Sequence, residues 1–143
     1  MIVRTPSLTR RLTDDLAALL DHLKSPPVYV LGWSDGGIEA LLLGIHHPEK
    51  VKMIAAMAAN LVPGGTYPEV LAMLHTMLGS VPAAERDTAE GKRQIKVTDM
   101  LLVEPRIDPA ALEAIKAPTL VLASDHDLIR DEHTLEIMEA SQY

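Results

Sequence analysis

The sequence predicts an α/β fold, with a parallel sheet of about three strands flanked by helices. Short apolar runs bounded by proline or glycine alternate along the chain with longer segments of helical periodicity. Polar clusters follow directly after two of these runs, at residues 32–37 and 124–127. This alternation is typical of parallel strands covered on both faces, and such sheets carry their sites beyond the carboxyl ends of the strands.

The first helix is predicted between Pro6 and the proline pair at residues 26–27, which cannot continue a helix. Ser7 or Thr9 is placed to cap its amino end. Its leucines recur at the spacing of one helical face: Leu12, Leu16, Leu19, Leu20 and Leu23.

Three apolar runs are predicted to be strands, at residues 28–31, 51–58 and 118–123. The second run contains methionine and alanine, so a helix is the alternative there. Residues 38–47 are rich in leucine and alanine and predict a buried helix, and a last helix is expected over residues 131–140.

Residues 61–115 differ from the rest of the single domain that we expect over residues 1–143. They predict a mostly helical insertion that covers the strand ends as a cap. A helix over residues 68–78 is indicated by the spacing of Val70, Met73, Leu74 and Met77. Asp108 can cap a short helix over residues 109–115, which has proline in its first position.

The composition excludes several classes of function. Without cysteine the chain has no disulfide, thiolate nucleophile or cysteine zinc site, and we expect neither a cofactor nor a metal. A formal net charge of −7 argues against a nucleic-acid partner. The apolar stretches are too short to span a bilayer, and the first residues lack the apolar core of a signal peptide. We therefore expect no membrane association and a cytoplasmic location.

The strongest motif is Gly32-x-Ser34-x-Gly36, which lies between an apolar run and a predicted helix. This is the pattern of a nucleophilic serine on a tight strand-to-helix turn, the nucleophile elbow. The two glycines are expected to avoid side-chain clashes in that turn. The helix directs its dipole and N–H groups at the site, and the N–H of Asp35 would help to hold an oxyanion. The alternative is an ordinary glycine-rich helix entry.

Four segments, in this order, resemble the α/β-hydrolase superfamily, and its esterase-like members in particular. They are Gly32-Trp33-Ser34-Asp35-Gly36-Gly37, His47-Pro48-Glu49-Lys50-Val51, Ala117-Pro118-Thr119-Leu120-Val121-Leu122 and Asp125-His126-Asp127. The resemblance covers essentially the whole chain. It implies a serine hydrolase that acts on ester or related acyl bonds of a small molecule, through an acyl-enzyme at Ser34 and without a cofactor.

The resemblance also implies a catalytic acid in the turn after the strand that follows the cap. Asp127 matches this position best, and Asp125 is the competitor. Such an acid orients the catalytic imidazole and stabilises its charged form. Ordinary turn chemistry at a strand end is the alternative for both aspartates.

The histidine of the family follows the acid after one further strand, and no histidine of this chain matches that position. The six present are His22, His46, His47, His75, His126 and His133. The strands and the His-Gly loop that the family places before the nucleophile are also absent. We therefore expect a chain truncated at both ends, with little or no activity; if it does turn over, His126 or His133 would supply the base.

Two other functions stay open beside the hydrolase. One is a non-catalytic binding module of the same fold, which holds a ligand without turning it over, and the other is an inactive fragment. The expected partner is a small ester-like molecule. Self-association is a further possibility, through the open apolar edge that the absent strands leave.

Overall fold

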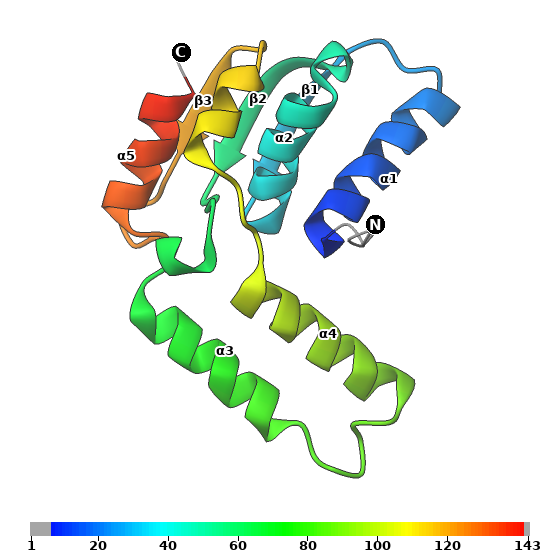
Figure 1. The fold of residues 1–143 in the computed structure, drawn as a ribbon, viewed down its shortest axis with the longest axis vertical. Helices are drawn as coiled ribbons and strands as arrows, with labels where there is room; N and C mark the ends of the chain where they lie inside the picture. The colour runs from blue at the N-terminus through cyan, green and yellow to red at the C-terminus, as the bar shows by residue number, and fades with distance from the viewer. Residues whose placement is uncertain (1–6, 142–143) are drawn as a thin grey trace, which may run out of the picture.

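Residues 7–141 are described in a computed structural model. Its centre is a parallel sheet of β1 (Val28–Trp33), β2 (Val51–Met57) and β3 (Thr119–Leu122), in the order β1-β2-β3 (Figure 1). The helices are α1 (Leu8–His22), α2 (Asp35–His46), α3 (Pro68–Ser80), α4 (Ala89–Val103) and α5 (Asp131–Ala140), with three short 3₁₀ helices, η1 (Pro48–Lys50), η2 (Pro63–Gly65) and η3 (Pro109–Ala114). The predicted fold class is confirmed.

The predicted elements are present, several of them with shifted ends. β1 continues to Trp33, two residues past the apolar run, and α2 begins at Asp35, directly after Ser34, which agrees with the predicted serine turn into a helix. The run at residues 51–58 forms β2, so the helical alternative was wrong. The short helix capped by Asp108 is a 3₁₀ helix, in which the Ala110 N–H donates to Asp108 Oδ1 at 3.0 Å.

The three strands end together at one edge of the sheet. Trp33 pairs with Met57, and Met57 pairs with Leu122, each the last residue of its strand. The segments that follow β1 and β3 therefore emerge side by side, as expected for the carboxyl ends of parallel strands.

Only one face of the sheet is covered by helices in the described part of the chain, so the expectation of two covered faces was wrong. α2 packs against β1 and β2, and α5 with η3 lies beside β3 on the same side (Figure 1). Right-handed crossovers between strands that follow one another in the order β1-β2-β3 put both connections on one face. The other face exposes Tyr29, Leu31 and Trp33, which are 66%, 77% and 72% accessible.

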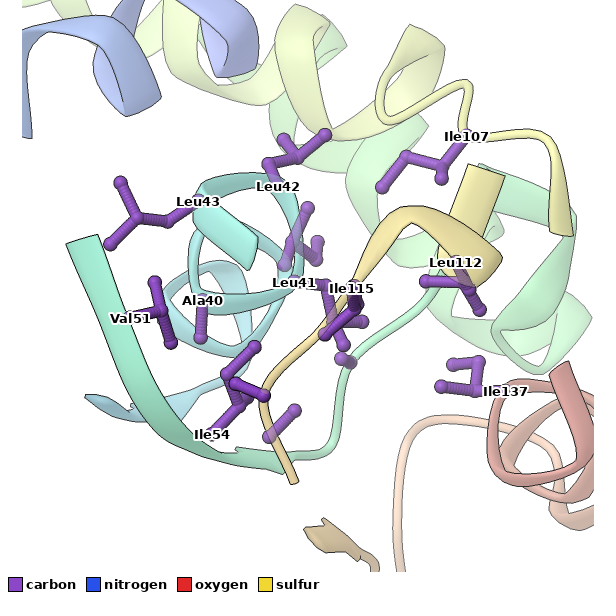
Figure 2. Packing of buried hydrophobic residues seen from close by; sticks show 14 of the residues in the cluster. Ala40, Leu41, Leu42, Leu43, Val51, Ile54, Ile107, Leu112, Ile115 and Ile137 are labelled. Carbon is purple, nitrogen blue, oxygen red and sulfur yellow. The ribbon is translucent and has the colours of Figure 1, made fainter. Parts of the chain in front are cut away.

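The hydrophobic core lies between α2 and the covered face. Ala40, Leu41 and Leu43 of α2 are fully buried and belong to one cluster with Val51 and Ile54 of β2 (Figure 2). Leu112 and Ile115, at and just after η3, and Ile137 of α5 extend this core toward β3. The predicted buried helix is thus the central element of the packing.

Only part of the leucine face predicted for α1 packs against the rest of the protein. Leu16 and Leu20 pack against the core, whereas Leu12, Leu19 and Leu23 are exposed. The buried positions of α1 are instead Thr9, Thr13 and Ala17. Two of these are hydroxyl residues that contact the carboxylates of Glu104 and Glu39, and a pattern of apolar residues cannot anticipate such a contact. Ser7 caps the helix, accepting from the Arg10 N–H at 3.2 Å.

α3 and α4 pack against each other and extend away from the sheet layer (Figure 1). The helical content expected for residues 61–115 is observed, and the described residues of this segment add no strand to the sheet. Within residues 7–141, none of the helices combines the length and the hydropathy needed to cross a bilayer.

Candidate active site

Ser34 lies between β1 and α2 in a strained backbone conformation. Its φ of 56° and ψ of −122° fall outside the regions that residues other than glycine ordinarily occupy. Its carbonyl accepts from the N–H groups of Gly37 at 2.8 Å and Ile38 at 3.1 Å, which closes the turn into the helix. The predicted strand–turn–helix is confirmed. Strain of this kind is concentrated at functional sites.

The glycines of the motif have different roles, and the expectation for Gly36 was wrong. A Cβ at Gly32 would lie 1.9 Å from the carbonyl oxygen of Gly36, so only glycine fits there. At Gly36 a Cβ would meet no described atom within 4 Å apart from its chain neighbours and the nearby backbone of its own helix. The unexpected constraint is at Gly37, where a Cβ would lie 2.9 Å from the Met57 carbonyl oxygen. The steric requirement for glycine therefore holds at Gly32, before Ser34, and does not hold at Gly36, after it.

The N–H of Asp35 remains available at the amino end of α2. Among residues 7–141 it donates no recorded hydrogen bond, whereas the N–H of Ser34 donates to the Met57 carbonyl at 2.9 Å. The Asp35 side chain lines the same pocket as Ser34, and desolvation raises the pKa of its carboxyl. That this N–H donates to an oxyanion stays a prediction.

Asp127 lies on the pocket and Asp125 does not line it. The Asp127 carboxylate accepts from the N–H of Ser124 through Oδ2 and from the N–H of Ile129 through Oδ1, each at 3.1 Å. Ser34 and Asp127 are therefore on the same edge of the sheet, as predicted. That they are close enough for one imidazole to bridge them stays a prediction.

The pocket between the strand ends and the α3–α4 pair has a volume of about 310 Å³. Its walls are largely apolar, and the helices contribute Val70, Met73, Leu74 and Leu101. The sheet side contributes the following residues: Trp33, Ser34, Asp35, Ile38, Met57, His126 and Asp127. Such a pocket, apolar with a few polar groups at one end, is the usual form of a small-molecule site.

Of the six histidines, His126 is the one that lines this pocket. The ring of His133 makes its contacts outside the pocket. His133 is buried, its Nε2 accepts from the N–H of Leu61 at 2.9 Å, and its Nδ1 lies 2.9 Å from Glu136 Oε2. Both ring nitrogens are thus occupied. His133 is therefore not free to act as a catalytic base, and a role for His126 stays a prediction.

Glu39 and Glu104, which the sequence analysis did not single out, contact α1, and Glu104 also lines the pocket. Glu104 accepts from the N–H groups of Leu8 at 2.9 Å and Thr9 at 2.8 Å, and also from the Thr9 hydroxyl. Thr13 Oγ1 is in hydrogen-bond contact with both the Thr9 carbonyl and Glu39. A hydroxyl has a single proton, so both contacts of Thr13 are satisfied together only when Glu39 is protonated and donates.

The stability of the chain is expected to fall with rising pH because of Glu39. Burial, together with repulsion from Asp35 and Glu104, raises the pKa of Glu39 to about 7. A carboxyl with a raised folded-state pKa contributes stability that is present below the ordinary pKa of 4.5 and lost as the pH rises through about 7. With a discount for partial exposure, the loss is about 1–3 kcal/mol.

This loss is measured as the free energy of unfolding in urea across that pH range. Glu39→Gln, which keeps the neutral form at every pH, is expected to remove most of the dependence. Glu113→Gln on the exposed surface of η3 is the control and should keep it. Equal pH slopes for the two variants would show that Glu39 titrates normally.

The fold, the strained serine turn and the pocket at the strand ends define an α/β hydrolase. Residues 8–86, more than half of the chain, match the alpha/beta hydrolase fold family, and the chain belongs to it.

Among curated proteins, the chain is 41% identical over 63 residues to a pimeloyl-[acyl-carrier protein] methyl ester esterase of Neisseria meningitidis. This match covers 41% of the chain and 24% of that esterase, so the chain spans about a quarter of the length of the curated relatives it matches.

Among solved structures, a hydrolase from Pseudomonas aeruginosa aligns with a TM-score of 0.64 at 22% identity, over 98% of this chain and 63% of that one. An enol-lactonase from Burkholderia xenovorans aligns with a TM-score of 0.65 at 19% identity, over 95% and 63%. At these identities the likeness shows the fold.

Proposed function

We propose that this protein is an esterase-type serine hydrolase in which Ser34 attacks the carbonyl carbon of a small-molecule ester. The observation that carries the proposal is the left-handed backbone of Ser34 at a strand-to-helix turn that opens into an apolar pocket. A residue other than glycine is strained there, and the strain presents its hydroxyl at the carboxyl end of the sheet.

The neighbouring groups fit the remaining roles of acyl transfer. The N–H of Asp35, at the amino end of α2, would donate to the oxyanion of the tetrahedral intermediate. Asp127 would orient an imidazole and stabilise its charged form. α3 and α4 would act as a cap, and their apolar side chains would hold the acyl part of the ester. The curated relative acts, by its name, on a methyl ester, which fits an ester substrate here.

The reaction is expected to be slow for this chain alone. Serine is a weak nucleophile without a base in hydrogen-bond reach, and His133 is held by Leu61 and Glu136. His126 lines the pocket, and it makes no hydrogen bond with another residue in the range 7–141. This observation favours, as a second candidate, a binding module that holds the ester without hydrolysing it.

Incubation with a fluorophosphonate probe, followed by mass spectrometry of the labelled peptide, is expected to find the label on Ser34. The label should disappear in Ser34→Ala. The matched control is Ser124→Ala, because Ser124 also lines the pocket and its replacement should leave the label unchanged.

The same experiment separates the candidates. Label on a residue other than Ser34 would overturn the assignment of the nucleophile. An unlabelled chain that still binds an ester would favour the binding module. Labelling that also falls in His126→Ala would identify His126 as the base.

A further inference from the structure

The pocket around Ser34 combines apolar walls with several carboxylates. Its carboxylate lining residues within the described chain are Asp35, Glu104 and Asp127; the basic lining residue is His126, and neither lysine nor arginine is present. The α3–α4 side is apolar, so water and counter-ions screen these charges less than they would on an open surface. A ligand in this pocket therefore lies in a negative potential.

Glu104 is held in the ionised state where the chain leaves α4. Desolvation acts to raise the pKa of its carboxyl, but the hydrogen bonds from Thr9 and Leu8 hold that pKa below its ordinary value. The carboxylate is fixed in place by these bonds to the amino end of α1. Its negative charge is therefore held at a fixed position beside the pocket.

Asp35 carries a charge without a partner beside the reacting serine. Its side chain makes no recorded hydrogen bond or ion pair with any residue in the range 7–141, although it follows Ser34 directly and lines the pocket. Asp35 and Glu104 both repel the charge of Glu39, so their fields overlap in this region. A further anion that enters the pocket meets the same repulsion.

Resting on the proposed function, we propose that the pocket selects acyl groups that are neutral along their whole length and rejects those that carry a second carboxylate. Asp35 and Glu104 are the residues that determine this specificity. A carboxylate in the acyl chain would be desolvated by the apolar walls without a lysine or arginine to pair with, and Asp35 and Glu104 would repel it.

This selection has a consequence for the reaction. Hydrolysis adds water across the ester bond and yields an alcohol, a carboxylate and a proton. When a neutral diester loses one ester group, its product is an anion of the rejected class. The carboxylates that leave the neutral substrate unaffected repel this anionic product, so product inhibition should be weak.

Binding is tested without turnover in a Ser34→Ala background, by the fluorescence of Trp33, the single tryptophan, which lines the pocket. The ligands are dimethyl adipate and monomethyl adipate, which share one chain and differ by one carboxylate. At about pH 8.5, where carboxylates are ionised, the diester is expected to bind on the order of tenfold more tightly than the monoester.

Asp35→Asn and Glu104→Gln are each expected to narrow this ratio by several-fold by strengthening the binding of the monoester. Glu69→Gln removes an equal charge from the exposed surface of α3 and should leave the ratio unchanged. Asp35→Asn is the decisive variant, because its side chain holds no other part of the fold, whereas Glu104→Gln disturbs the contact with α1.

Equal affinities for the two ligands would overturn the proposal, as would failure of the diester to bind or an unchanged ratio in Asp35→Asn. None of these outcomes depends on catalysis. Failure of the fluorophosphonate to label Ser34 would remove the proposed reaction while leaving the measured selectivity in place.

Discussion

Replacement of Gly32 by alanine is expected to destabilise the protein by more than about 3 kcal/mol, or to prevent folding altogether. The new Cβ would lie 1.9 Å from the carbonyl oxygen of Gly36, 2.2 Å from its carbonyl carbon and 2.6 Å from the nitrogen of Gly37. These are backbone atoms of the first turn of α2, so no side-chain rotation can relieve the clash. β1 and α2 would have to separate, and α2 supplies the centre of the core.

Gly36→Ala is the matched control, since it makes the same chemical change four residues later. A Cβ there meets open space within the described chain, and alanine is favoured over glycine in a helix by about 0.5–1 kcal/mol. Its urea midpoint should therefore equal or exceed that of the parent, while Gly32→Ala should lose most of its native circular dichroism. Similar midpoints for the two variants would mean that the turn is not as tight as described.

The sequence predicts most of the fold because its signals are local. The runs that form β1 and β3 are short, apolar and bounded by proline or glycine, and each is confirmed within two residues. α5 begins and ends where its pattern indicates. These features depend on neighbouring residues along the chain, and such residues are what a periodicity describes.

The errors concern which surface is covered, because that depends on residues far apart in the sequence. The leucines of α1 satisfy a helical period, but the face that packs is chosen by Glu39 and Glu104, which approach its threonines from α2 and from the end of α4. Likewise, alternation predicts a parallel sheet but not on which side its connections run. Strand order and crossover handedness decide that together.

In the candidate site, too, the features with a local sequence signal were predicted and those that depend on distant residues were not. Ser34 was predicted from its glycine motif and Asp127 from the resemblance to the family, and their location at one edge of the sheet was predicted because both follow parallel strands. Glu104 reaches the pocket from the end of α4 without a motif of its own, and nothing in the sequence near His133 indicates that its ring binds the backbone of Leu61. The self-association expected through the open sheet edge stays a prediction, for which the exposed Leu31 of β1 is the natural site to test.

His133→Ala is expected to destabilise the protein by about 2–4 kcal/mol. The imidazole accepts the N–H of Leu61 inside the protein, and its removal leaves that buried donor unpaired. It also leaves a cavity beside Gly65, whose lack of a Cβ makes room for the ring: a Cβ there would lie 2.2 Å from His133 Cδ2. The loop that joins β2 to α3 would lose its main side-chain contact with α5.

The effect of this loss should be local as well as global. Two backbone bonds, from the Arg130 N–H to the Gly65 carbonyl at 2.9 Å and from the Tyr67 N–H to the Leu128 carbonyl at 3.1 Å, also tie this loop to the segment that contains Asp127. Hydrogen exchange should therefore speed up at Leu61 and Tyr67 in His133→Ala, beyond what the fall in overall stability explains. His126→Ala, which removes an exposed ring only seven residues earlier, should change the free energy of unfolding by less than about 0.5 kcal/mol. If the two variants unfold at the same urea concentration, the buried imidazole does not hold the loop, and the backbone bonds of Gly65 and Tyr67 are sufficient to fix it.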